Sequence, residues 1–291
     1  MTPGGTYKVL HTFDSKTQPD GTGIYGMVQA PDGNLYGTTV AGAQFKPFNS
    51  VFRFDLSTGQ YTILHGFNTP NINLPGVATS APTLASTGEL FGLQAFGQLY
   101  EISLAGKYQK IGNLSPSGFF DGHILQASDG NLWGDFLGGD CSGEGIAFSA
   151  STTGSLLQNL TFDCTTIGEQ PAAMIQAADG KFYGVTLGDG GVNTNSVLNG
   201  TIWSLDAGLA PAAVGITAFR PASGNVGSSV IVEGNHFVGT TAVSVNGTNV
   251  AFQVLSVNYL KLTVPSGATT GPIMVTNAGG TTTSAKSFTV P

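Results

Sequence analysis

The chain has 291 residues, which is enough for two domains, and no stretch of it is polar enough to put folding in doubt. Only 9% of its residues are charged while 43 are glycine, and this scarcity of strong helix formers argues for an all-β fold with short strands and tight turns. The net charge of −7 argues against a nucleic-acid partner, and no apolar run is long enough to insert into a bilayer.

The N-terminal sequence MTPGGTYKVLHTF has neither the basic nor the apolar region of a signal peptide. It fits a mature domain from which such a segment has been removed, or a cytoplasmic protein. Within it, residues 7–13 (YKVLHTF) match residues 61–67 (YTILHGF) nearly residue for residue. Both segments are predicted to be strands, and the repeated histidine, His11 and His65, is interpreted as a packing residue rather than a catalyst.

A short phrase recurs four times before residue 205. Its copies are PDGNLYG at 31–37, STGELFG at 86–92, SDGNLWG at 128–134 and ADGKFYG at 178–184. An apolar segment precedes each copy, and further apolar stretches follow it. Because Asp-Gly and Thr-Gly supply the positive φ that tight hairpin turns require, each repeat is predicted to be an antiparallel unit of four strands.

Four strands in about 40–50 residues is the size of one propeller blade. We therefore predict a four-bladed β-propeller over residues 1–208, with repeats at 24–67, 79–114, 121–162 and 171–205. The last repeat is one strand short, so residues 7–13 are predicted to pair beside it and close the ring, which removes exposed sheet edges. In the alternative, the four repeats are half of a larger ring that a second chain completes.

The repeats resemble the tandem repeats called GloVer, which occur in bacterial extracellular proteins with varied surface anchors. The resemblance covers residues 7–205 and is carried by the Asp-Gly turn, the aromatic-Gly pair and the LHxF strand. The second repeat departs most, with TGELFG in place of DGNLYG. The resemblance implies an extracellular setting and no particular activity.

After a linker at 209–214, residues 215–291 alternate apolar and polar positions in short segments divided by turn residues, which predicts about seven strands in a sandwich. This part resembles the IPT/TIG domain, an immunoglobulin-like module that usually acts as a spacer or adhesive unit. The resemblance is carried by Pro221, Gly224, Gly227, Gly234, Phe237, Val245–Asn246–Gly247, Val264–Pro265 and Gly271–Pro272, with the closing SFTV. Nothing in it suggests catalysis.

Candidate site residues are those that break the repeat. The positions of His123 and Asp135 hold uncharged residues in the other copies: Gly26, Ala81 and Ala173 for the first, Thr38, Leu93 and Val185 for the second. Together with Asp121 and Asp140 they are predicted to gather at one rim of the channel. Carboxylates near a histidine suit acid–base catalysis or a bound cation, and the alternative is a set of solvated loop residues.

The same rim is predicted to receive ligand-binding residues from several loops: Phe45, Phe48, Phe120, Phe136, Glu144 and Asp189. Exposed rings beside carboxylates suit stacking on sugars, whereas buried rings would only pin the loops. No cofactor is expected. Calcium is kept as an alternative because the loop GDGGVNTN (188–195) is rich in oxygen ligands, although it does not fit the spacing of an EF-hand.

Cys141 and Cys164 are predicted to form a disulfide between two loops of the third repeat. On the loop-entropy estimate the bridge stabilises the fold by about 3 kcal/mol, and it would fit an oxidising, extracellular environment. The alternative is a reactive thiol at Cys141, but no basic neighbour is at hand to lower its pKa.

The leading hypothesis is a secreted or cell-surface protein, monomeric, whose propeller rim binds an extracellular polysaccharide or surface glycan. A second is an enzyme, a glycoside hydrolase or polysaccharide lyase, that uses Asp121, His123, Asp135 and Asp140. A third is a structural subunit of a surface layer or filament, as a dimer or polymer. The sequence leaves open whether the protein is an enzyme, because no motif of fixed spacing supports one.

Overall fold

The computed structural model describes residues 7–13, 23–40, 49–67, 78–114, 122–136, 145–162, 169–188, 200–256 and 258–291. Within these residues the chain is all-β, apart from one 3-10 turn, η1, at Ala95–Gly97. The chain divides into two compact units, the first of Met1–Ile175 with Gly184–Trp203 and the second of Gln176–Tyr183 with Ser204–Pro291. No helix in the described part of the chain is long and apolar enough to cross a membrane.

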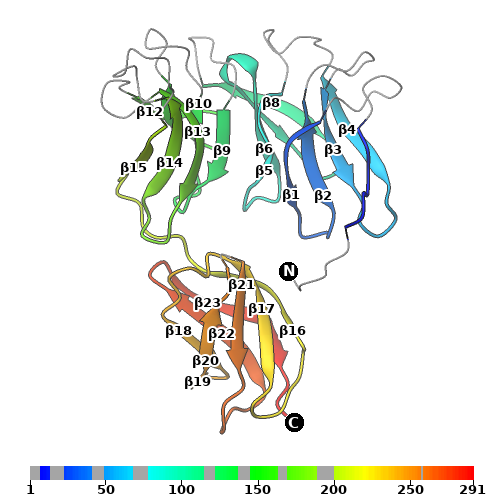
Figure 1. The fold of residues 1–291 in the computed structure, drawn as a ribbon, viewed down its shortest axis with the longest axis vertical. Coiled ribbons are helices and arrows are strands. Elements are labelled where there is room, and N and C mark those ends of the chain that lie inside the picture. The colour runs from blue at the N-terminus through cyan, green and yellow to red at the C-terminus, as the bar shows by residue number, and fades with distance from the viewer. Residues whose placement is uncertain are drawn as a thin grey trace. The chain divides into compact units, whose positions relative to one another are not determined.

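Each sequence repeat forms its own antiparallel sheet, with neighbouring strands in chain order (Figure 1). The first sheet contains β1 (Ile24–Gln29), β2 (Leu35–Thr39), β3 (Asn49–Phe54) and β4 (Tyr61–Phe67). The second contains β5 (Thr83–Leu84), β6 (Leu90–Gln94), β7 (Gln98–Ile102) and β8 (Tyr108–Asn113). The third contains β9 (Gly122–Gln126), β10 (Leu132–Phe136), β11 (Ile146–Ala150) and β12 (Leu156–Thr161). The fourth has three described strands, β13 (Glu169–Gln176), β14 (Phe182–Gly188) and β15 (Ile202–Leu205).

The recurring Asp-Gly turn is tied to the recurring aromatic residue four positions after its aspartate. Asp32 accepts a hydrogen bond from the Tyr36 hydroxyl at 2.7 Å, and Asp129 accepts one from the Trp133 indole at 3.2 Å. Burial, and then this hydrogen bond, raises the pKa of Tyr36 to about 12. In the second repeat Thr87 replaces the aspartate and Phe91, which has no polar atom, replaces the tyrosine. Both partners of this hydrogen bond are therefore replaced in the same repeat.

The glycine after each of these aromatic residues leaves room for a ring from the next strand of its sheet. A Cβ on Gly134 would lie 2.6 Å from the Phe148 ring of β11 and 2.2 Å from the carbonyl oxygen of His123. A Cβ on Gly92 would lie 2.3 Å from the Tyr100 ring of β7. Both distances are below van der Waals contact, so a side chain at these positions would displace a core ring or the neighbouring strand.

Successive sheets pack against one another through shared apolar clusters. One cluster joins Val51 of the first sheet to Leu90 of the second, and another joins Leu99 of the second to Ile124 of the third. Between the third and fourth sheets, the ring of Phe162, which follows β12, packs edge-on against Trp203 of β15 with centroids 5.0 Å apart. The predicted all-β, propeller-like stacking of repeat sheets is thereby confirmed.

The first described segment, residues 7–13, is not paired with the fourth sheet among the described residues, so closure of the ring by this segment stays a prediction. It forms no strand, and it lies against the first sheet, where His11 stacks on Tyr61 of β4 with centroids 4.3 Å apart and Phe13 contacts Phe52 of β3. Aromatic contacts with β3 and β4 therefore place this segment, and among the described residues the four sheets do not join into a closed ring through it.

The C-terminal part forms two four-stranded sheets around their own core, which confirms the immunoglobulin-like sandwich. One sheet contains β16 (Gly215–Arg220), β17 (Ser229–Asn235), β21 (Tyr259–Thr263) and β20 (Ala251–Val254). The other contains β19 (Thr248–Asn249), β18 (Ala242–Val245), β22 (Gly271–Asn277) and β23 (Gly280–Phe288). Alternate residues of these strands, such as Val230, Leu260 and Ile273, are buried between the sheets.

Candidate functional site

Three of the predicted site residues fall in the described part of the chain: His123, Asp135 and Phe136. The other candidates lie outside the described residues: Asp121, Asp140, Phe45, Phe48, Phe120, Glu144, Asp189, Cys141 and Cys164. The predicted disulfide and the loop proposed for calcium therefore stay predictions. In the part of the chain that is described, no three His, Cys, Asp or Glu residues are grouped as a metal ion would require.

His123 and Asp135 are brought together by the hairpin of the third repeat. They are direct cross-strand partners in the register of β9 and β10, so both side chains project from the same face of the sheet. Asp135 Oδ1 lies 2.8 Å from His123 Nδ1 and accepts a hydrogen bond from the His123 backbone N–H at 3.1 Å. Two contacts to one carboxylate oxygen hold the imidazole in a defined orientation.

The two members of this pair differ sharply in their access to solvent. The Asp135 side chain is 0% exposed, whereas the His123 side chain is 44% exposed. Asp135 Oδ2 is also buried and accepts no hydrogen bond from the described residues. Burial raises the pKa of Asp135 above its usual value, and the contacts with His123 oppose that shift. A buried carboxylate thus supports an imidazole that solvent can reach.

The repeat itself does not need this carboxylate. At the positions equivalent to Asp135 the first and second sheets bury Thr38 and Leu93, which fill the same space between sheets without a charge. A charged group in such a place costs stability unless it is fully paired, and Oδ2 has no described partner. The pair is therefore a local departure from a stable pattern, and such departures are typical of functional sites.

Phe136, the third described candidate, does not present its ring to a ligand. It is 1% exposed, stacks on Phe148 of β11 with centroids 4.8 Å apart, and belongs to the cluster between the second and third sheets. It acts as a core residue beside the His123–Asp135 pair, which is the alternative that the sequence left open for these rings.

The chemistry of the pair follows from its geometry. A neutral imidazole that donates its Nδ1 proton to a carboxylate keeps Nε2 as an acceptor, which is the state of a general base and also of a histidine metal ligand. The same groups hydrogen-bond well to hydroxyl groups. The symmetric register of a hairpin about the Asp129–Gly130 turn could have revealed from sequence that positions 123 and 135 face each other.

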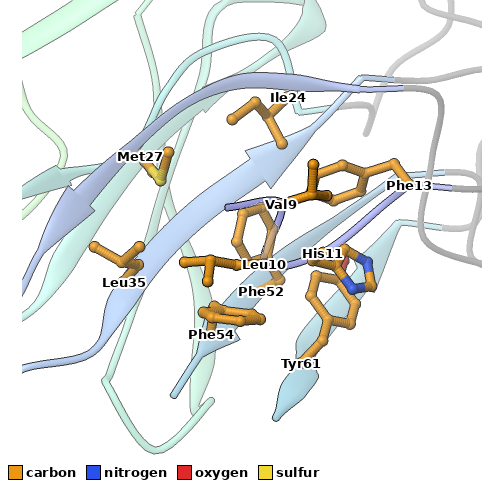
Figure 2. A pocket seen from close by; sticks show the side chains of 10 residues that line it. All are labelled: Val9, Leu10, His11, Phe13, Ile24, Met27, Leu35, Phe52, Phe54 and Tyr61. Atoms are coloured by element: carbon orange, nitrogen blue, oxygen red, sulfur yellow. The ribbon is translucent and has the colours of Figure 1, made fainter. Parts of the chain in front are cut away.

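Sequence reasoning missed an apolar pocket of about 190 Å³ on the first sheet (Figure 2). Residues from the segment 7–13 form one side of it and residues of the first sheet the other: Val9, Leu10, His11, Phe13, Ile24, Met27, Leu35, Phe52, Phe54 and Tyr61. The match between residues 7–13 and 61–67 was the signal that could have found it, because residues 61–67 also pack on a neighbouring sheet.

Residues 215–290 match the IPT/TIG domain family, in agreement with the sandwich formed by β16 to β23. No curated protein matches the chain. Two solved structures match a short part of the chain, each with 29% identity and a TM-score of 0.25. The matches cover 27% and 28% of this chain but only 18% and 33% of the two structures. The first of them is a Bacteroides thetaiotaomicron protein described as a phosphatase.

Three solved structures resemble most of the chain at low identity. A gluconolactonase from Xanthomonas campestris is 11% identical over 90% of this chain and 86% of its own, with a TM-score of 0.43. A catalytically inactive virginiamycin B lyase from Staphylococcus aureus is 13% identical over 89% and 78%, with a TM-score of 0.42. The extracellular domain of a hybrid two-component system from Bacteroides thetaiotaomicron is 14% identical over 92% and 34%, with a TM-score of 0.40. Likeness at this level transfers no activity or site residue to this chain.

Proposed function

We propose that this protein is a secreted or cell-surface binding module. The repeat sheets bind an extracellular carbohydrate at the end of the third sheet that carries His123 and Asp135, and the IPT/TIG domain acts as a spacer or adhesive unit. The observation that carries the proposal is the fully buried Asp135 carboxylate that orients a half-exposed imidazole. An IPT/TIG domain beside a repeat domain supports the placement at the cell surface.

The cost of this arrangement supports a ligand rather than a purely structural role. Thr38, at the equivalent position of the first sheet, fills its site with a neutral hydroxyl that meets the Tyr100 hydroxyl at 3.4 Å. Asp135 instead keeps an acidic group that burial disfavours in its charged form. In exchange for this loss of stability, the carboxylate holds the His123 imidazole in a fixed orientation at the surface. Such an imidazole suits hydrogen bonds to the hydroxyl groups of a sugar.

A panel of polysaccharides, assayed by calorimetry with the full chain, tests this function. His123→Ala should weaken binding of any positive glycan by about tenfold or more, since such a loss corresponds to one hydrogen bond to ligand. His236→Ala is the matched control, because that histidine is exposed, belongs to the sandwich, and has its Nδ1 3.1 Å from the Ala213 carbonyl oxygen. Binding that survives both His123→Ala and Asp135→Asn, or no binding across the panel, would contradict the proposal.

A glycoside hydrolase or polysaccharide lyase is the second candidate, and the Nδ1–carboxylate contact is the observation that favours it. In that role His123 Nε2 would remove or deliver a proton at the bound sugar, and Asp135 would hold the tautomer and orientation. Product detection on the same panel separates the two functions. Turnover that disappears in His123→Ala establishes the enzyme, whereas binding with intact polysaccharide favours the module.

A further inference from the structure

The outer face of the fourth sheet exposes apolar side chains that the other three sheets bury. Ile202 in β15 is 84% exposed, yet the residues at its position in the first, second and third sheets are all buried: Val51, Leu99 and Ala147. Val185 in β14 is likewise exposed where the other sheets bury their equivalents. Val51 and Leu99 are covered by the sheet that follows their own. The fourth sheet thus carries the contact face for a following sheet, with no such sheet among the described residues.

The first sheet shows the complementary feature on its opposite face. Met27 of β1 is 54% exposed, whereas its equivalents Ile124 in β9 and Met174 in β13 are buried. Ile124 is covered by the sheet that precedes its own, in the cluster shared with Leu99. The pocket of Figure 2 lies on this face, where Met27 and Leu35 of the first sheet form part of its lining. The first sheet thus carries the contact face for a preceding sheet.

Residues 7–13 already cover part of the first sheet in the way that a strand of a preceding sheet would. His11 stacks on Tyr61 at 4.3 Å and 1°, and His65 of β4 stacks on Tyr108 of β8 at 3.8 Å and 6°. The phenylalanine two residues after each histidine has the same contact: the ring centroids of Phe13 and Tyr61 are 5.9 Å apart, and so are those of Phe67 and Tyr108. Residues 7–13 therefore lie on the first sheet as β4, a fourth strand, lies on the second.

The fourth sheet lacks the element that residues 7–13 resemble. Its described strands end at β15, whereas each of the other sheets has a fourth strand beside the third. The first and fourth sheets are the first and last of the repeat sheets along the chain, and the exposure of Met27 and Ile202 shows that these two faces do not cover each other. A three-stranded sheet with the face of β13 to β15 is the occupant that fits both the apolar surface of the first sheet and the segment 7–13 that lies on it.

We propose that a second copy of this chain supplies that sheet. Two copies then form one closed ring of eight sheets, in which residues 7–13 of each chain pair with β15 of the other. The contact repeats the sheet-to-sheet packing found inside the chain, with apolar faces on both sides. Each copy offers two different faces, so the contact is head-to-tail and can close into a ring. A ring of two copies has eight sheets, which is within the range of known propellers. Pairing at β15 would also remove an exposed sheet edge.

The mass of the full chain in solution, measured by light scattering over a range of concentrations, is the primary test. The proposal expects a particle of twice the 29.7 kDa chain mass. A mass of one chain at every concentration would overturn it in favour of closure within the chain. A mass that keeps growing with concentration would also overturn it, because head-to-tail contacts would then form an open polymer such as a filament.

Single substitutions test which faces form the contact. Ile202→Asp and Met27→Asp each place a charge in both contacts of the ring and should weaken the dimer by about 100-fold or more. Leu157→Asp is the matched control, since Leu157 is 51% exposed in β12 of the third sheet and should leave the mass unchanged. Circular dichroism melts of the separated chains should be alike, because Ile202 and Met27 are exposed in the single chain.

A mixture of the two variants gives a readout that a folding defect would not. In a ring made of one Ile202→Asp chain and one Met27→Asp chain, both substitutions fall in the same contact and the other contact is unchanged. The mixture should therefore recover dimers at concentrations where either variant alone is a single chain. If the mixture stays dissociated, or if Leu157→Asp dissociates as well, the assignment of the two faces is overturned.

Discussion

The imidazole of His65 stacks on the ring of Tyr108 across the contact between the first and second sheets, with centroids 3.8 Å apart. Burial is the cause that lowers the pKa of His65 below its usual value. Burial therefore favours the neutral form of this imidazole, and charging it costs stability in the folded chain. The repeated histidine of the LHxF segment thus has a packing role, as interpreted from the repeat, and makes folding depend on pH.

His65→Ala should lower the free energy of unfolding by about 1 kcal/mol at pH 8, because the stacked pair is lost. The unfolded chain binds more protons at this position than the folded chain, since the folded pKa is the lower one. The wild-type contribution is therefore complete above the unfolded pKa of about 6.5 and falls as the pH drops below it. His65→Phe should keep the stack and remove this dependence. Urea unfolding at pH 8 and pH 5 measures both effects, and equal pH dependence in wild type and His65→Phe would contradict them.

Asp32→Ala should lower the free energy of unfolding by about 1–3 kcal/mol, because the buried Tyr36 loses the acceptor of its hydroxyl. Thr87→Ala in the second repeat is the matched control. It should be nearly neutral, since Phe91 has no hydroxyl to satisfy. Thermal unfolding of the two variants checks the difference, and similar losses would show that the turn acts through its backbone alone.

Gly134→Ala should lower the free energy of unfolding by about 1–3 kcal/mol, because the added methyl meets the Phe148 ring and the His123 carbonyl below contact distance. The carbonyl belongs to β9, so the substitution also disturbs the strand that carries the site. Gly23→Ala is the matched control, since a Cβ there has no neighbour within 4 Å. Denaturant unfolding of both variants measures the difference. An unchanged free energy of unfolding in Gly134→Ala would mean that β10 can shift in the sheet to accommodate the methyl group.

Asp135→Asn should make the protein more stable than wild type at pH 8. Since burial raises the folded pKa of Asp135, the folded chain binds more protons here than the unfolded chain, and the stability contributed by this group falls as the pH rises through the folded pKa. Asparagine removes that loss while its carbonyl can still accept from His123. The difference should shrink as the pH falls towards the unfolded pKa of about 3.9. Urea midpoints at pH 4 and pH 8 measure it.

A wild type that is more stable than Asp135→Asn at pH 8 would instead mean that the ionised carboxylate is stabilised by His123. Combined with the glycan assay, the expected result is a variant that gains stability and loses binding. That combination is typical of a residue kept for function at a cost in stability.

Much of the fold was predictable because its determinants are local. The Asp-Gly turns, the aromatic residue four positions after the aspartate and the glycine after it are short-range requirements, and they repeat with every sheet. The sandwich was predictable for the same reason, since alternation along each strand marks the buried face. The candidate site was predictable only as a pair of exceptions, His123 and Asp135, within this regular pattern.

The amino-acid sequence by itself determined that the chain forms repeat sheets followed by an immunoglobulin-like sandwich, because hairpin turns and strand alternation depend on neighbours in the chain. Only the tertiary structure decided that Asp135 is buried under a half-exposed His123, that Phe136 belongs to the core, and that residues 7–13 lie on the first sheet. These outcomes depend on how one sheet covers the next. Burial and stacking between distant segments are properties of that packing, and the local pattern of residues is compatible with more than one of them.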